Sequence, residues 1–342
     1  MRVMRMRSAG QPLDAHRLIL EEAPMPRAEH PGDVVVRVAA AGVCRTDLHL
    51  ITGEMTAPVP LVLGHENAGW VHEVGPGVTT VSVGDAVLCF PFITGGLSAA
   101  ERAGLETADP DRRTPGITVD GGYGEYLLTN ERAMLAVPAD ADLASLATLT
   151  DAGLAAYRAA RKAASILRPG DTALVIGVGG LGHLGVQILR ALTPASLVAV
   201  DTSDAARQLA IDCGADRALA PDAIAGALGD GVRACLDFVG SDTTAALGFE
   251  HLEFGGCYLA VGVGGNLSFP LAALVEGERR VEGVYVGTYR DLVEVTELVL
   301  AGAVTPRVVR YGLEQANEAL EDLAAGRILG RAVLEPHREV EP

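Results

Sequence analysis

The sequence contains no pair of cysteines at a C-x-x-C spacing, and its five cysteines are scattered along 342 residues. An odd, dispersed set provides no disulfide framework. Cys213, Cys235 and Cys257 fall in predicted helix or strand interiors, where a thiol usually packs as a small apolar side chain. Cys89 is expected to be buried in a strand in the same way.

Positive charge is also scarce, since 27 Lys and Arg face 44 Asp and Glu, for a formal net charge of −17. Such a chain repels nucleic acid backbones and anionic lipid surfaces. No apolar run approaches the roughly 18 residues of a membrane span, and the N-terminal segment lacks the apolar core of a signal peptide. We therefore expect a cytoplasmic protein with no nucleic-acid or membrane partner.

The length and the 49% hydrophobic content favour two domains in an α/β fold. Short β-like runs broken by Gly and Pro occupy residues 34–38, 67–74, 85–89 and 123–128. From residue 172 onward, apolar runs at 172–176, 197–200, 234–239 and 258–261 alternate with helical segments, which is typical of a doubly wound parallel sheet.

These patterns predict a β-rich domain over residues 1–150, a parallel-sheet domain over 151–286 and a return to the first domain over 287–342. The helical periodicity predicts helices at 181–192 and 290–301 and one from about Ser203 that Gly214 ends. Short strands are expected up to Leu334. The charged tail after Pro336 is expected to fray.

A glycine-rich turn follows the strand predicted at 172–176 and opens the next helix. It reads Gly177-Val178-Gly179-Gly180-Leu181-Gly182, a G-x-G-x-x-G in the context of a dinucleotide-binding unit. The first glycine permits the tight turn, the second lets backbone amides approach a pyrophosphate, and the third allows helix and strand to pack closely.

The following strand ends at Asp201, 24 residues after Gly177. A carboxylate there accepts hydrogen bonds from the adenosine ribose and repels a 2′-phosphate, so NAD is favoured over NADP. Arg207 lies nearby and would soften that preference. Val239 and Val261, the last residues of two further predicted strands, are assigned to the cofactor site as well.

Three distant segments each carry a potential zinc ligand: Cys44, His65 and Asp151. A thiolate, an imidazole and a carboxylate suit a catalytic site, in which three protein ligands leave one position open. Each residue alone is more often structural, and His65-Glu66 is no zincin motif because no second His follows at the required spacing. Spacing alone does not join the three segments.

The segments around Cys44, His65, Asp151 and the glycine-rich turn together resemble the medium-chain dehydrogenase/reductase superfamily, specifically bacterial zinc alcohol dehydrogenases acting on secondary alcohols. The resemblance spans nearly the whole chain, from the strand at Asp33 to Leu334. It implies a GroES-like catalytic domain containing an inserted Rossmann domain, with the active site in the cleft between them. It also makes Cys44, His65 and Asp151 the ligands of a catalytic zinc.

Further roles follow from the resemblance. Glu66 matches a carboxylate that approaches the metal during ligand exchange, and Asp47 matches a group that orients the ligating His. Thr46 and His49 match a proton relay that runs from the substrate hydroxyl through the cofactor ribose to solvent. The residues that match the cations binding the pyrophosphate are Arg45 and Arg331.

The sequence departs from the family at a lobe that usually binds a structural zinc through four cysteines. The corresponding slots fall at about Gly95, Ser98, Glu101 and Asp109. We therefore predict one zinc per chain. A replacement site using Glu101 and Asp109 is disfavoured, because their oxygens lack the soft partners that zinc prefers. Another feature must order this loop, for which packing at a subunit interface is one hypothesis.

The predicted activity is hydride transfer between NAD and an alcohol or carbonyl compound, with an uncharged, hydrophobic substrate favoured. Three alternatives stay open: a zinc-independent quinone or enoyl reductase, a zinc biosynthetic reductase acting on an imine, enal or polyol, and a non-catalytic NAD-binding protein. A homodimer or homotetramer is expected, in which the strands near 258–261 and 281–286 pair sheet edges across subunits.

Overall fold

The computed structural model describes residues 1–10 and 17–338. The chain forms two compact units, one made of Met1–Ala152, Thr288–Thr296 and the residues from Pro306 on, the other of Gly153–Gly287 and Glu297–Thr305. Residues 339–342, which make up most of the tail predicted to fray, lie outside the described residues.

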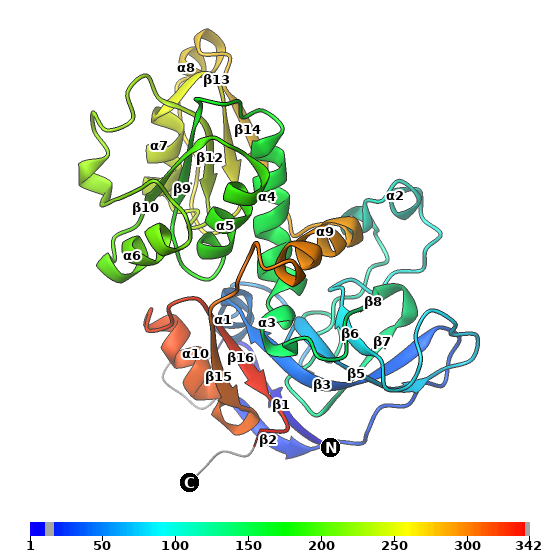
Figure 1. Ribbon diagram of the computed structural model, residues 1–342. Coiled ribbons are helices and arrows are strands. Elements are labelled where there is room, and N and C mark those ends of the chain that lie inside the picture. The colour runs from blue at the N-terminus through cyan, green and yellow to red at the C-terminus, as the bar shows by residue number, and fades with distance from the viewer. Residues whose placement is uncertain (11–16, 339–342) are drawn as a thin grey trace. The chain divides into compact units, whose positions relative to one another are not determined.

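The first unit is built around a mixed sheet in which β3 is the central and longest strand (Figure 1). Its order is β15-β16-β3-β5-β6-β8, with β7 also paired to β3, and only β15 and β16 run parallel. The bounds are β3 Asp33–Val43, β5 Glu66–Val74, β6 Ala86–Cys89, β7 Tyr126–Asn130, β8 Met134–Ala136, β15 Val308–Gly312 and β16 Arg331–Glu335.

A smaller three-stranded sheet of order β2-β1-β4 completes the strands of this unit. Its strands are β1 Arg2–Met6, β2 Leu18–Glu22 and β4 Leu61–Val62. The helices are α1 Arg45–Thr52, α2 Ala99–Arg102, α3 Leu143–Ala147 and α10 Ala316–Ala324. A π-helical turn, Leu149–Gly153, follows α3 in the sequence. Helix α9, Tyr289–Leu300, contains the boundary between the two units.

The second unit contains a six-stranded parallel sheet of order β11-β10-β9-β12-β13-β14. Strands of nearly continuous apolar sequence form its centre, as expected for a sheet covered on both faces. Their bounds are β9 Thr172–Ile176, β10 Ser196–Val200, β11 Arg217–Leu219, β12 Val232–Asp237, β13 Leu252–Ala260 and β14 Arg280–Gly283. The strand order reverses between β9 and β12, where ligands bind in doubly wound sheets.

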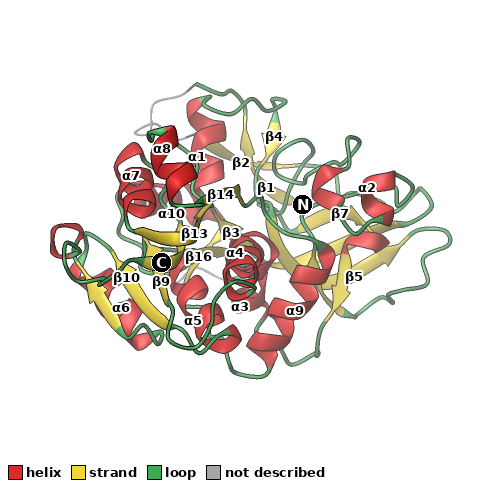
Figure 2. Ribbon diagram, turned by 90° about the horizontal axis from the view of Figure 1, so that it is seen from above, coloured by secondary structure: helices red, strands yellow, loops and turns green. Residues whose placement is uncertain are grey.

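Helices flank this parallel sheet (Figure 2). Their bounds are α4 Leu154–Ala164, α5 Gly182–Leu192, α6 Asp204–Asp212, α7 Asp242–Glu250 and α8 Leu271–Glu276. Phe249, on α7, belongs to the core of this unit, and the ring of the half-buried Phe269 stacks against it. The predicted alternation of strands and helices is confirmed, including the helix that the Ser203 side chain caps and after which Gly214 turns left-handed.

Two local predictions were wrong. The strand expected at 123–128 begins only at Tyr126, because residues 121–123 pair with residues 62–64 instead. Cys213 is only half-buried, since it stands at the end of α6, whereas Cys235 and Cys257 are buried in strands as expected.

Among the residues described, no helix combines the length and the apolar character needed to cross a bilayer.

Candidate active site

Four potential metal ligands meet in the first unit, although they are distant in sequence. Cys44 directly follows β3 and precedes α1, and His65 lies in the short link between β4 and β5. Glu66 is the first residue of β5 and faces Gly42 of β3 across the sheet. Asp151 lies in the π-helical turn, a distortion that often occurs at functional sites.

One ligand atom from each of Cys44, His65, Glu66 and Asp151 lies within 4.8 Å of the others. We call these four residues the ligand cluster. Asp151 Oδ2 is 3.6 Å from His65 Nε2 and 3.8 Å from Cys44 Sγ. In a tetrahedral zinc site, bond lengths of about 2.0 to 2.3 Å place ligand atoms about 3.3 to 3.8 Å apart. The structure therefore brings the three sequence-predicted ligands to separations that one ion can bridge.

Small residues and backbone contacts hold the cluster in place. A Cβ atom on Gly42 would lie 1.9 Å from Glu66 Oε2, so only glycine leaves room for that carboxylate. The Thr150 hydroxyl accepts a hydrogen bond of 3.0 Å from the Asn67 amide. This bond joins the turn that carries Asp151 to the strand that follows His65.

Burial and mutual charge perturb the ionisable groups of the cluster. Burial alone would lower the pKa of His65, but the nearby carboxylates of Asp47 and Asp151 raise it well above its usual value. Burial alone would raise the pKa of Asp151, yet its contact with His65 lowers it. For Glu66 burial wins and the pKa is raised. The cluster therefore concentrates negative charge around one imidazole, a field suited to a cation.

Several buried polar atoms of the cluster and of the neighbouring Asp47 accept or donate no hydrogen bond within the described part of the chain. They include both ring nitrogens of His65, Oε2 of Glu66 and Oδ1 of Asp47. Buried polar atoms are rarely left in this state, because desolvation without a partner costs about 1 to 3 kcal/mol per group. The donor set, one sulfur, one nitrogen and carboxylate oxygens, is one that zinc accepts. The residues present thus fit the zinc that the family implies.

Asp47 connects the two sides of the cluster. Its Oδ2 accepts a 2.9 Å hydrogen bond from the Cys44 amide and a 2.7 Å bond from the Tyr123 hydroxyl. Its Oδ1 lies 3.4 Å from Nδ1 of His65, which leaves Nε2 of that ring on the side of Asp151. The orienting role expected of Asp47 stays a prediction, for which this contact provides the geometry.

Arg331 occupies an unexpected environment. It is the first residue of β16, is buried, and donates to Oε1 of Glu66. The Glu66 charge helps to raise the arginine's pKa against the effect of burial. The guanidinium therefore neutralises Glu66 here, and the pyrophosphate contact that the resemblance implies for Arg331 stays a prediction.

The relay candidates lie on the first turns of α1. The Cys44 thiol lies 3.7 Å from the Thr46 hydroxyl. Nδ1 of His49 lies 2.6 Å from Oε2 of the exposed Glu54, an ion-pair partner that the sequence analysis did not assign. Arg45 is exposed at the start of the same helix. Thr46 therefore borders the cluster, whereas His49 faces an acidic partner near solvent.

In the second unit the glycine-rich turn joins β9 to α5. Gly177 has a positive φ of 83°, which favours glycine, and a Cβ on Gly182 would lie 1.8 Å from the Gly177 carbonyl oxygen. A Cβ on Gly179 would meet nothing within 4 Å, so the backbone there is open to a ligand. Gly180 and Leu181 lie directly before α5, at whose N-terminus an anion is stabilised.

Asp201 follows β10 and approaches the same turn. Its Oδ2 accepts a 2.8 Å hydrogen bond from the Val178 amide, and its Oδ1 accepts one of 2.9 Å from Ser203. Val239 and Val261 both lie just beyond the ends of β12 and β13, since these strands end at Asp237 and Ala260. All of these positions gather at the carboxyl edge of the parallel sheet.

The lobe, residues 93–115, is closed at its base by paired backbone bonds between Ile93 and Arg113. Inside it, Oε1 of Glu101 accepts a 2.6 Å bond from the Gly96 amide. Its Oε2 accepts 3.2 Å bonds from the amide and the hydroxyl of Ser98. Asp109 is 2% exposed and also contacts the Glu101 carboxylate. We call Glu101 and Asp109 the acidic clasp.

Hydrogen bonding outweighs burial in setting the pKa of Glu101. Burial alone would raise the pKa of Glu101, but the bonds from Thr94 and the two backbone amides lower it to about 2. A carboxylate thus organises the lobe at the positions where the family places cysteines. Packing at a subunit interface stays a second hypothesis for what orders this loop.

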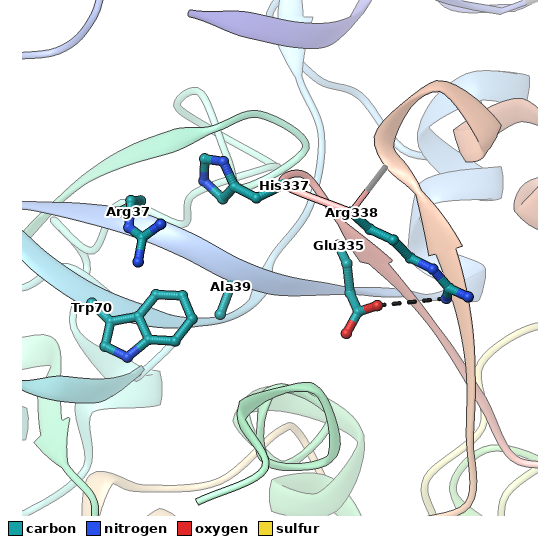
Figure 3. Close-up of a pocket in the computed structure, with 6 residues that line it drawn as sticks. All are labelled: Arg37, Ala39, Trp70, Glu335, His337 and Arg338. Carbon is teal, nitrogen blue, oxygen red and sulfur yellow. Dashed lines mark ion pairs between the residues drawn. The ribbon is translucent and has the colours of Figure 1, made fainter. Parts of the chain in front are cut away.

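A separate hollow of about 270 Å³ lies on the first unit (Figure 3). Arg37 stacks over Trp70 at 4.5 Å, and Glu335 pairs with Arg338 at 3.5 Å. Its lining contains none of the predicted site residues, and Glu335 also pairs with Arg310, which lies outside the lining. The hollow is therefore distinct from the candidate active site.

Comparison with known proteins identifies the family of this chain. Residues 30–139 match the alcohol dehydrogenase GroES-like domain, and residues 180–301 match the zinc-binding dehydrogenase domain. An NAD-dependent alcohol dehydrogenase of Sulfurisphaera tokodaii is 34% identical, with 98% of this chain and 100% of that protein covered.

Solved structures agree with this result. The alcohol dehydrogenase of Aeropyrum pernix is 38% identical with a TM-score of 0.93, covering 98% of this chain and 100% of the other. An acetophenone reductase from Geotrichum candidum, solved with NAD, is 31% identical with a TM-score of 0.89, covering 99% and 98%.

The chain belongs to the zinc-binding alcohol dehydrogenases of the medium-chain dehydrogenase/reductase superfamily. The predicted α/β architecture, a GroES-like domain with a Rossmann-type sheet, is confirmed. So are the predicted use of zinc and NAD and the interconversion of alcohols and carbonyl compounds. A small-molecule alcohol is accordingly the substrate class.

The sequence analysis missed several residues that support the cluster. Tyr123 lies 76 residues from Asp47, and Thr150 lies 83 residues from Asn67. Neither pair follows a helical or strand periodicity that would have linked them. The glycines at 121–122, which precede Tyr123, were the available signal, because adjacent glycines often mark a close backbone approach.

Proposed function

We propose that this chain is a single-zinc, NAD-linked dehydrogenase that oxidises uncharged, apolar secondary alcohols and reduces the corresponding ketones. The observation that carries the proposal is the ligand cluster, in which a thiol, an imidazole and two carboxylates lie within 4.8 Å of one another. Both buried ring nitrogens of His65 lack a hydrogen-bond partner among the described residues. We assign Cys44, His65 and Asp151 as the ligands.

Zinc held there supplies Lewis acidity, which polarises a substrate oxygen and makes an alcohol easier to deprotonate. Thr46, whose hydroxyl lies beside the Cys44 thiol, accepts the proton of the substrate hydroxyl in this proposal and passes its own proton along the relay towards His49. His49 passes the proton to solvent, with Glu54 as its partner. Asp47 keeps His65 oriented, and Arg331 neutralises Glu66.

For the cofactor, we assign the backbone at Gly177, Gly179, Gly180 and Leu181 to the pyrophosphate, and Asp201 to the adenosine ribose. The open space above Gly179 and the helix start at Gly182 support this assignment. Arg45 and Arg331 complete the pyrophosphate contacts, and Val239 and Val261 border the nicotinamide half. In this proposal residues 1–150 and 287–342 form the catalytic domain and residues 151–286 the NAD-binding domain.

The substrate class rests on similarity to a solved relative. The Geotrichum candidum relative is an acetophenone reductase by name, and acetophenone is an uncharged aryl ketone. We therefore expect 1-phenylethanol and acetophenone to be turned over better than polyols or short primary alcohols.

We also propose that the enzyme is a cytoplasmic homo-oligomer. Strand β14 stands at the edge of the parallel sheet, and the nearby helix α8 exposes 73% of Leu271 and 71% of Val275. An unpaired edge beside exposed apolar side chains is a typical association surface. Sedimentation velocity distinguishes a monomer from a dimer or tetramer.

The test combines metal emission spectroscopy with a substrate panel. We expect one zinc per chain and NADH formation with secondary alcohols that exceeds the rate with NADP. The panel includes a polyol, an enal and a cyclic imine, which represent the alternative biosynthetic reductases. A zinc-free protein with full activity, or strict activity on a polyol, contradicts the proposal.

A further inference from the structure

Tyr123 is a fully buried phenol beside the ligand cluster. Its exposed fraction is 0%, and its hydroxyl lies 2.7 Å from Oδ2 of Asp47 and 3.3 Å from the carbonyl oxygen of Gly42. A hydroxyl has one proton to donate, and the shorter contact takes it. Because a hydrogen bond to a carboxylate is charge-assisted, this bond is among the stronger ones in the unit.

The carboxylate that receives this bond has two tasks. Its Oδ2 also accepts from the Cys44 amide at 2.9 Å, while its Oδ1 faces Nδ1 of His65 at 3.4 Å. The bond from the Cys44 amide alone leaves the carboxylate free to rotate about that contact. The second donor, Tyr123, fixes the carboxylate plane and hence the position of Oδ1.

Backbone contacts lock Tyr123 to the segment that carries His65. The Tyr123 amide donates to the Leu63 carbonyl at 2.9 Å, and the Gly122 amide donates to the Gly64 carbonyl at 2.8 Å. Gly64 has a φ of 97°, and a Cβ there would lie 2.4 Å from the Tyr123 ring. The phenol is thus held against the residue that precedes His65.

We propose that Tyr123 is a positioning residue for the metal site, because its hydroxyl fixes the Asp47 carboxylate that orients the ring of His65. The inference rests on the proposed function, in which His65 binds zinc. Outer groups of this kind typically change metal affinity or activity about 10- to 100-fold when removed. Tyr123 acts one contact farther out, so a change of about tenfold in the zinc release rate is expected.

Tyr123→Phe removes only the hydroxyl and keeps the ring against Gly64. Tyr311→Phe is the matched control, because the Tyr311 hydroxyl donates to Asp322 at the same distance of 2.7 Å. Neither Tyr311 nor Asp322 belongs to the ligand cluster. The holoenzymes of wild type and both variants are mixed with a coloured chelator, and zinc release is followed as a first-order rate. Circular dichroism and thermal unfolding check the fold of each protein.

A second measurement reports the geometry of the site without turnover. The zinc is exchanged for cobalt, and the visible ligand-field and thiolate charge-transfer bands are recorded. We expect Tyr123→Phe to release zinc about tenfold faster than wild type and to shift the cobalt bands. Tyr311→Phe should keep the wild-type rate and spectrum, even though it loses a comparable hydrogen bond.

Wild-type release and an unchanged cobalt spectrum in folded Tyr123→Phe overturn the proposal, and so does equal acceleration in both variants. A wild-type protein that binds no zinc overturns the proposed function and this inference together. If Tyr123→Phe does not fold, 3-fluorotyrosine at position 123 keeps the ring and makes the hydroxyl a stronger donor. Zinc release should then slow, and an unchanged rate and spectrum again overturn the proposal.

Discussion

The ligand cluster and the acidic clasp are two buried acidic sites of the same unit that satisfy their charges in opposite ways. Within the described chain, the cluster leaves both His65 ring nitrogens and Oε2 of Glu66 without hydrogen-bond partners. In the clasp both oxygens of Glu101 accept bonds, from Gly96 and Ser98. The first site is arranged for a cation, whereas the second is complete with protein donors.

This difference shows how a lobe without metal-binding cysteines can still be ordered. Four thiolates require a metal to share, but one carboxylate can gather amide and hydroxyl donors by itself. The lobe therefore keeps its closed base between Ile93 and Arg113 without soft ligands. The chemistry of the ligand cluster depends on a metal, whereas the local order of the lobe depends on the hydrogen bonds of the acidic clasp.

The largest expected effect comes from Cys44→Ala. Losing the thiolate should remove zinc and lower turnover by about a thousandfold or more, because a Lewis acid contributes several kcal/mol to the barrier. NAD binding, measured by fluorescence titration, should persist. Cys89→Ala is the matched control, since Cys89 is equally buried on β6 and burial raises its thiol pKa to about 12. If the Cys44→Ala protein is active without zinc, the ligand cluster does not depend on a metal, and its contrast with the acidic clasp is wrong.

Removing the metal with a chelator tests both regions in one sample. At zinc concentrations a hundredfold above Kd, bound zinc adds about 2.7 kcal/mol to the free energy of unfolding, and chelation removes that contribution. Hydrogen exchange should accelerate in residues 43–52 and 61–67 and stay unchanged in residues 93–115. Faster exchange in the lobe would mean that the clasp also depends on a metal.

Glu101→Gln tests the clasp directly. The amide nitrogen of Gln would face the backbone donors that Glu101 now satisfies, so we expect the free energy of unfolding to fall by about 1.5 to 3 kcal/mol in urea denaturation. Zinc content should not change. Glu106→Gln is the control within the lobe, because Glu106 accepts a long hydrogen bond of 3.4 Å from the Tyr289 amide. Its effect should stay within about 0.5 kcal/mol.

The smallest expected effect is the change with pH of the difference in unfolding free energy between wild type and Glu101→Gln. The pKa of Glu101 is lowered from its ordinary 4.5 to about 2, so its stabilisation is present above pH 4.5 and is lost as the pH falls through about 2. The gap in unfolding free energy between wild type and Glu101→Gln should therefore narrow from pH 5 to pH 3. A gap that is constant over this range indicates that the charge of Glu101 is not what stabilises the lobe.

Sequence patterns predicted the repeating elements well, and for a physical reason. Buried parallel strands such as β9 are continuous apolar runs, and the glycine-rich turn between β9 and α5 has a fixed spacing. The strand at Tyr126–Asn130 was placed too early, because pairing with a distant segment decides where a strand begins.

The site was predictable only in part. Resemblance to a family joined Cys44, His65 and Asp151, and the structure brings them together. The donors of Glu101 are local in sequence, yet their convergence depends on how the lobe folds. The contact of Arg331 with Glu66 spans 265 residues and arises because β16, β3 and β5 are neighbours in one sheet. No local periodicity encodes such a pair.

Gly42 sets a limit on how this enzyme can be engineered. The free oxygen of Glu66 occupies the space that any side chain at position 42 would need, with only 1.9 Å left to a Cβ. Even alanine would displace the carboxylate and, with it, the guanidinium that neutralises it. Libraries that reshape the substrate pocket should therefore keep position 42 constant.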